Sequence, residues 1–327
     1  MPESRSTPLA GQERFLAPIE ETPLQETGSL DTSAPPESQW KEAWKDLRRN
    51  WLFWISAAMI ALVAVVVIAP GLFTDLDPSY ADLSKSLDPG SSGHIAGFDK
   101  QGYDVFARMV YGARASVLVG LLTTILIVVV GVMTGAVAGF YGGWVDSIIS
   151  RIADIFFAIP LLLGALVVLS VINNLFPNRG EFGAIIAVVG ALGLFGWPQV
   201  TRITRGQVLQ VKNMEFIDAA RAIGATKRSN LLRHVIPNSL APVIVTATVS
   251  LGILIVAEAT LSYLGIGLPP GVVSWGNDIS AAQNQIRSGQ RIGVMFWPAG
   301  ALAFTALGFI ILGDAVSDAL NPKRRSE

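Results

Sequence analysis

Side chains that could form covalent intermediates or bind metal are scarce in this 327-residue sequence. It has no cysteine, which excludes thiol chemistry, disulfides and Cys-ligated metal centres. The two histidines, His94 and His234, are distant in sequence, and neither an H-E-x-x-H zinc motif nor a G-x4-G-K-[ST] phosphate loop occurs. Asp314 and Asp318 have i and i+4 spacing, which we interpret as a solvated helix end. The sequence therefore predicts no catalytic residue and no metal site.

A polar connection late in the chain has the spacing of two short helices instead. Asn213 is expected to cap a helix from Met214 to about Ile223, and Gly224 to end it in a left-handed conformation. Thr226 is expected to cap a second helix, which ends before Pro237. A connection of this length with its own helix signals is unusual between packed helices and indicates a functional segment.

The first of these helices has an apolar face that could dock on another protein. Four small or apolar residues recur at i, i+3, i+4 and i+7, and acidic residues lie near the helix N-terminus, where the helix dipole favours them. A short helix of this kind suits a groove on a partner protein. The apolar residues are Phe216, Ala219, Ala220 and Ile223.

The elements that position this connection are predicted to be transmembrane helices. Hydrophobic residues make up 51% of the chain and charged residues only 15%, and a helix needs about 20 mostly apolar residues to cross a bilayer. The sequence therefore predicts an all-α integral membrane protein with six transmembrane helices. The six stretches are Trp51 to Ala69, Ala115 to about Tyr141, Ile155 to Ile172, Phe182 to Thr201, Leu240 to about Leu264, and Ile292 to Gly313.

The six stretches divide the chain into five parts. We expect residues 1–40 to be a disordered tail, 41–73 an interfacial segment with the first transmembrane helix, 74–114 an extracytoplasmic loop, 115–320 the remaining core, and 321–327 a short C-terminus. Lysine and arginine number 17 on the side that holds both termini and 7 on the other. The positive-inside rule therefore predicts that both termini and the polar connection are cytoplasmic.

The polar connection resembles a family signature. An EAA-like triplet at residues 218–220 precedes Gly224 and Pro237 at the spacing EAA-x3-G-x9-I-x-L-P, found in inner-membrane permease subunits of bacterial ABC importers. This chain departs from the signature at three positions: it has Asp218 for Glu, His234 for Ile and Ile236 for Leu. In that family the segment is the coupling helix, which docks on the cytoplasmic ATPase. The resemblance implies this role for Glu215, Asp218, Ala219, Ala220, Arg221, Gly224, His234 and Pro237.

Other segments resemble the C-type permeases of dipeptide, oligopeptide and nickel importers. These segments are residues 97–114, 139–146, 258–265, 274–276 and 312–322. The resemblance implies a type I ABC importer permease bundle, with the coupling segment at about 213–237 between helices 4 and 5, in a prokaryotic inner membrane. It also implies a homologous second permease, two ABC ATPase subunits and an extracytoplasmic binding protein as partners. ATP and Mg²⁺ would bind the ATPases and not this chain.

Cargo is the least defined part of the resemblance. Di- and oligopeptides are the first expectation, and a nickel chelate, glutathione or another small solute imported by the same machinery is the alternative. Recognition of the cargo is expected to depend mainly on the binding protein, so the permease sequence does not separate these substrates.

Four residues inside the hydrophobic stretches have predicted roles. Gly131, Gly135 and Gly139 form a GxxxGxxxG face, which predicts close packing against another helix. Glu258 is the only charged residue in the fifth stretch, where an ionisable group is expensive without a partner. Two roles are open for Glu258: contact with the amino end of a peptide in an outer vestibule of the translocation path, or a structural hydrogen bond.

Two other classes of membrane protein are weighed against the permease. An intramembrane enzyme would need a Ser/His pair, paired Asp residues or a zinc motif at membrane depth, and the sequence has none in a recognisable pattern. An autonomous transporter or channel would be favoured by an inverted repeat of discontinuous helices, and none is detected. Contact with nucleic acid is not expected, because the net charge is only -1.

Overall fold

The computed structural model describes residues 39–287 and 293–320. The predicted disordered tail, apart from its last two residues, and the predicted C-terminus therefore lie outside the described residues. Within them the chain forms helices and loops, without a β-strand. The α-helices are α1 (Gln39–Arg49), α2 (Trp51–Ile68), α3 (Val105–Tyr141), α4 (Gly143–Phe157), α5 (Leu161–Leu175), α6 (Glu181–Val211), α7 (Glu215–Ala222), α8 (Lys227–Asn230), α9 (Ile236–Tyr263), α10 (Trp275–Arg287) and α11 (Gly293–Leu320).

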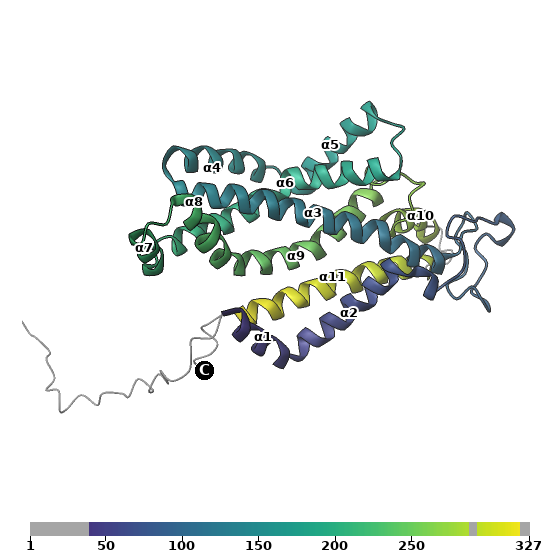
Figure 1. Cartoon of the computed structure of the whole chain (residues 1–327). Helices are drawn as coiled ribbons and strands as arrows, with labels where there is room; N and C mark the ends of the chain where they lie inside the picture. Colours follow the sequence, from purple (N-terminus) through teal and green to yellow (C-terminus); the bar gives the residue numbers. More distant parts are fainter. Residues whose placement is uncertain (1–38, 288–292, 321–327) are drawn as a thin grey trace, which may run out of the picture. The chain divides into compact units, whose positions relative to one another are not determined.

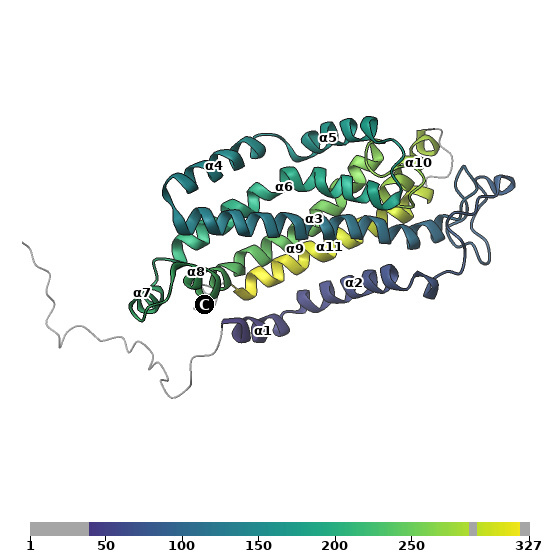
Figure 2. The same cartoon turned by 45° about the horizontal axis from the view of Figure 1, so that its top comes forward.

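Five helices are long and apolar enough to cross a membrane, and a sixth span results if the bent pair α4–α5 counts as one. The five are α2, α3, α6, α11 and a continuous run that joins α8 to α9 through the π-helical turn η3 (Leu231–Val235). Figures 1 and 2 show α3, α6 and α9 running side by side, with α2 and α11 along one side and α4 and α5 along another. The prediction of an all-α membrane protein is confirmed.

The third predicted span is interrupted. Residues 155–172 fall on two helices, α4 and α5, which are bent by 82° relative to each other. Pro160 stands directly before α5. Proline has no amide hydrogen and disfavours the helical conformation in the residue before it. The helix therefore stops after Phe157 and begins again at Leu161.

The second span begins at Val105, ten residues before the predicted start at Ala115, and so takes in part of the predicted loop. Asp104 caps this helix: its Oδ1 accepts a hydrogen bond from the amide of Ala107 at 2.8 Å. Polar residues such as Arg108 occupy the first turns, which is why a search for apolar stretches misses them. The helix ends at Gly142, whose φ of 66° is left-handed.

The most extensive helix contact in the described part of the chain joins α3 and α6. A Cβ atom built on Gly131 would lie 2.5 Å from Cβ of Val200, and one on Gly135 would lie 2.5 Å from the carbonyl oxygen of Thr201. On Gly139 it would lie 2.9 Å from the carbonyl oxygen of Arg205. The two backbones approach so closely that only glycine fits at these positions.

The long helices lead to two opposite ends of the bundle. One, called here the α7 end, carries α7 and α8 (Figure 1). The other, called the loop end, carries α10 and the loop of residues 69–104, which contains the short 3₁₀ turns η1 (Pro70–Leu72) and η2 (Leu83–Lys85) (Figures 1 and 2). The helix α10 lies between the fifth and sixth predicted transmembrane stretches.

Candidate functional site

At the α7 end, a small apolar cluster fixes the predicted coupling segment to the bundle. Ile217 of α7 is fully buried. It belongs to a cluster with residues from α3, α6 and η3, namely Ala136, Val208, Val211, Leu231 and Val235. Sequence reasoning missed Ile217, because the i, i+3, i+4, i+7 pattern begins one residue earlier, at Phe216. A buried isoleucine inside an eight-residue helix is the anchor of this segment.

The predicted apolar face of α7 is divided between two directions. Ala220 turns inward with Ile217, whereas Phe216, Ala219 and Ile223 are exposed, Ile223 with 88% of its surface accessible. Glu215 is also exposed. Asp218 and Arg221 form an exposed ion pair at 2.9 Å, and a pair of this kind adds little stability. The outward side of α7 is therefore a mixed apolar and charged surface at the tip of the molecule.

The start of α7 differs from the predicted cap. Met214 is the N-cap residue and provides no side-chain hydrogen bond. The side chain of Asn213 instead donates to the carbonyl of Leu209 in the preceding helix. The predicted stop is observed, because Gly224 has a φ of 93° and its amide donates to the carbonyl of Arg221. The amide of Ala225 closes the turn on the carbonyl of Ala220.

After the turn at Gly224 the chain enters the fifth long helix, which is continuous from Lys227. Thr226 caps α8 as predicted, accepting a hydrogen bond from the amide of Ser229. Pro237 does not end a helix: it lies in the first turn of α9, where its missing amide hydrogen is tolerated. His234 lies in the π-helical turn η3 between them. The fully buried Asn230 at this junction has no partner for its side-chain amide among the described residues.

Glu258 lies near the loop end of α9 and has no exposed surface. Its Oε1 accepts a hydrogen bond from the hydroxyl of Ser262 at 2.7 Å, and that hydroxyl oxygen accepts one from the amide of Leu268 at 3.0 Å. Ser262 lines a cavity at this end of the bundle, and Glu258 does not. Contact between Glu258 and cargo stays a prediction.

The first turn of α10 is wedged between α3 and α9. The indole Nε1 of Trp275 donates to the carbonyl of Met109 at 2.8 Å. Its backbone amide donates to the hydroxyl of Ser116 at 3.3 Å. A Cβ atom on Gly276 would lie 2.7 Å from Cα of Ala259, so only glycine fits here. These contacts fix α10 against α3 and against the part of α9 that contains Glu258.

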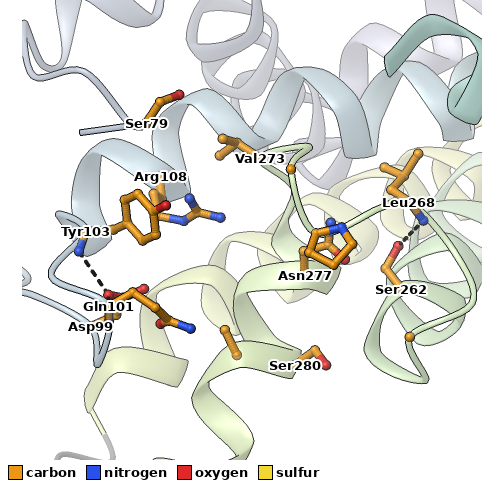
Figure 3. A pocket seen from close by; sticks show the side chains of 14 residues that line it. Ser79, Asp99, Gln101, Tyr103, Arg108, Ser262, Leu268, Val273, Asn277 and Ser280 are labelled. Atoms are coloured by element: carbon orange, nitrogen blue, oxygen red, sulfur yellow. Dashed lines mark hydrogen bonds between the residues drawn. The ribbon is translucent and has the colours of Figure 1, made fainter. Parts of the chain in front are cut away.

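A cavity of about 330 Å³ opens at the loop end above this region. Figure 3 shows Tyr103 and Arg108 on one side of it and Asn277 and Ser262 on another, with Ser280 at its edge. The loop of residues 69–104, the start of α3, the turn after α9 and the helix α10 all contribute to its wall. Its volume lies within the range of small-molecule sites.

A buried ion pair lies beside the cavity. Arg108 of α3 contacts Oδ1 of Asp278 at 2.6 Å, and the side chains are only 12% and 10% exposed. The ring of Tyr103 stacks on the guanidinium at 4.6 Å. Burial raises the pKa of Asp278 to about 6, although the charge of Arg108 opposes this rise. Burial also raises the pKa of Asp99, whose Oδ1 accepts amide hydrogen bonds from Gln101 and Tyr103.

The arrangement is that of a multi-pass membrane protein with the partly exposed helix α7 at one end and a cavity at the other. Residues 131–326 match the family described as "Binding-protein-dependent transport system inner membrane component". Residues 38–89 match the "N-terminal TM domain of oligopeptide transport permease C". The chain belongs to the first of these families, and is a permease subunit of a bacterial ABC importer and not an enzyme.

Relatives similar over most of the chain agree with this assignment. The oligopeptide transport system permease protein OppC of Bacillus subtilis is 36% identical over 88% of this chain and 91% of that protein. The dipeptide transport system permease protein DppC of Alkalihalophilus pseudofirmus is 34% identical over 90% and 95%. The glutathione transport system permease protein GsiD of Pectobacterium atrosepticum is 33% identical over 88% and 92%.

The fold is similar to that of a solved ABC importer permease. A chain of the MetNI methionine ABC transporter superimposes with a TM-score of 0.52 and 18% identity, over 65% of this chain and 96% of that one. The type I permease fold expected from the family resemblance is thus confirmed, and the likeness is limited to the fold.

Proposed function

We propose that this chain is the C-type permease of an importer for di- and oligopeptides. The names of the OppC and DppC relatives support this cargo. In this proposal the chain forms the translocation path with a homologous second permease, and an extracytoplasmic binding protein delivers the peptide to the loop end. Two ATPase subunits, which bind ATP and Mg²⁺, act on the α7 end.

The observation that carries the proposed coupling role is the geometry of α7. Ile217 fixes the helix to the bundle while Phe216 and Ile223 point away from it. An exposed isoleucine at the tip of a membrane protein is expensive in water, and a groove on a partner would cover it. The turn at Gly224 leads from α7 into the helical run that begins at Lys227 and includes α9, so force on α7 would reach the interior of the bundle.

The proposed orientation follows from charge. The α7 end, with the arginines and lysines of residues 202–233, faces the cytoplasm, and the loop end faces outward. Both termini are then cytoplasmic. The proposed domains are those expected from the sequence, except that the second transmembrane helix begins at Val105.

Transport of labelled peptide tests the proposed cargo. The complex that co-purifies with this chain is reconstituted with ATP inside proteoliposomes and its binding protein outside, and uptake of radiolabelled tri-alanine is measured. ATP-dependent uptake that excess unlabelled peptide abolishes is the expected result. Uptake of glutathione but not of tri-alanine would instead favour the second candidate, which the similarity to GsiD supports.

A further inference from the structure

The cavity at the loop end continues into a small recess that contains an unpaired carboxylate oxygen. The recess, with space of about 10 Å³, is lined by Asp99, Arg108, Asp278 and five apolar residues. Asp99, Arg108 and Ala281 also line the larger cavity, so the two spaces adjoin. Such a volume holds about one water molecule or one ammonium group.

The charges around the recess are not balanced. Among the described residues that line the two spaces, Arg108 is the sole cation, and Asp99 and Asp278 are the carboxylates. The guanidinium already contacts Oδ1 of Asp278 and reaches the carbonyl of Pro78. With both carboxylates ionised, the site has a net charge of one negative unit.

One of these carboxylates lacks a partner for half of its acceptors. The side chain of Asp278 is nine-tenths buried. Its Oδ2 is also buried and has no hydrogen-bond partner among the described residues. A buried, unsatisfied carboxylate oxygen costs free energy, and a bound cation would offset this cost. Burial raises the pKa values of Asp99 and Asp278, and the charge of Arg108 offsets this rise only in part.

The donors and acceptors of the wall also indicate which end of a ligand would enter. Each nitrogen of the Arg108 guanidinium already contacts Asp278 or the carbonyl of Pro78, so the group is less able to receive a carboxylate than a free guanidinium would be. A group that donates several hydrogen bonds and carries a positive charge fits the recess instead. A primary ammonium group has both properties.

We propose that the cavity at the loop end binds an alkylammonium group, with the ammonium in the recess between Asp99 and Asp278 and the rest of the ligand in the larger cavity. This inference rests on the proposed function, from which the ligand is the free amino terminus of a cargo peptide. The role differs from the one predicted for Glu258, because Ser262 lies between that residue and the cavity.

The absence of cysteine makes the site accessible to a clean labelling experiment. Ser280 lines the cavity, and a Ser280→Cys variant of the full chain in its complex would carry a single thiol on this subunit. Its reaction rates with cationic aminoethyl and anionic sulfonatoethyl methanethiosulfonate are measured by mass shift. Each rate is divided by the rate at Ser92→Cys, an exposed position in the loop of residues 69–104 that does not line the cavity.

The expected result is a preference for the cationic reagent of about tenfold or more, because a cleft of one charge concentrates counter-ions. Asp278→Asn and Asp99→Asn should each reduce this preference. The uncharged methyl methanethiosulfonate should react at the same rate in all variants, which shows that the cavity still folds. Tri-alanine should slow labelling without the binding protein, whereas N-acetyl-tri-alanine should not.

Two results would overturn the inference. Equal rates for cation and anion, or a preference that survives both Asp→Asn variants, would show that the carboxylates do not form a cation site. Protection that requires the binding protein would assign the cation to that protein and not to the cargo. Failure of tri-alanine uptake in proteoliposomes, with the labelling preference intact, would instead reject the peptide cargo and leave the ammonium site standing.

Discussion

At the scale of single residues, the loop end concentrates buried charge around Arg108. Its guanidinium is stacked on Tyr103 and contacts Asp278, while Asp99 caps the turn that leads to Tyr103. An ion pair removed from water contributes little net stability unless all of its polar atoms are satisfied. Oδ2 of Asp278 has no hydrogen-bond partner among the described residues. The ion pair therefore indicates a binding function and not a contribution to stability.

The ionisation of Asp278 should make stability depend on pH. Its pKa is about 6 in the folded chain against 3.8 for an ordinary aspartate, so the folded state binds the proton more tightly than the unfolded state. The free energy of unfolding should fall as the pH rises through this window, by an amount on the order of 2–3 kcal/mol. In Asp278→Asn this part of the pH dependence should disappear.

Thermal unfolding in detergent at about pH 4 and about pH 7.5 measures this effect. Asp75→Asn, an exposed change in the loop of residues 69–104, serves as the control and should follow the unmodified protein. An Asp278→Asn variant with the same pH slope as the unmodified protein would refute the assignment.

At the scale of elements, the close approach of α3 and α6 depends on glycine. In Gly135→Leu the new side chain meets the carbonyl of Thr201 and the side chain of Thr204, and the two helices must separate. We expect a loss of stability on the order of 1–3 kcal/mol. A lower midpoint of thermal unfolding in detergent would be the readout.

Gly190 provides a matched control on α6. It is exposed, and a Cβ atom there meets nothing within 4 Å. Gly190→Leu should therefore have a midpoint of thermal unfolding close to that of the unmodified protein. Equal effects of the two substitutions would show that helix propensity, and not packing, determines the outcome.

The turn at Gly224 should matter for coupling more than for folding. Its φ of 93° is strained for a β-branched residue, yet a Cβ atom there would meet nothing within 4 Å. Gly224→Val should therefore displace α7 without disturbing the bundle, and uncouple ATP hydrolysis from peptide uptake while membrane insertion continues. Gly224→Asn, which tolerates left-handed backbone better, should retain more coupling. Normal uptake per ATP in the valine variant would contradict the proposed role.

The sequence predicts the long helices well, because apolar stretches in a membrane protein have few alternatives. It also predicts the stop at Gly224 and the cap at Thr226, which depend on local chemistry. It does not predict the break at Pro160, because a proline within an apolar stretch is compatible with either a kink or a stop.

Features that depend on distant contacts are the hardest to predict. Ile217 is an anchor only because α3, α6 and η3 converge on it. The helix α10 lacks the length of a transmembrane span, and its position depends on how Trp275 and Gly276 fit between α3 and α9. The partnership of Arg108 with Asp278, 170 residues apart, has no signal in a single sequence.

At the scale of the whole molecule, one helical run connects the two ends. It extends from Lys227 to Tyr263, 37 residues, or about 55 Å at the rise of an α-helix. It begins directly after α7 and carries Glu258 and Ser262 near its far end, beneath the cavity. The π-helical turn η3 interrupts its regular hydrogen bonding near the start. A displacement of α7 would act on the run at this turn.

The proposed coupling role requires that the outward side of α7 binds the ATPase. The most direct test is purification of the tagged chain in a mild detergent, followed by mass spectrometry, for Ile223→Asp and for a matched control. The control is Leu83→Asp, which places the same charge on another exposed apolar residue, at the loop end. We predict that the unmodified chain and the control retain a second permease and ATPase subunits, while Ile223→Asp retains the permease and loses the ATPases. Full retention of the ATPases by Ile223→Asp, or their loss in the control as well, would contradict the proposed binding of the ATPase by α7.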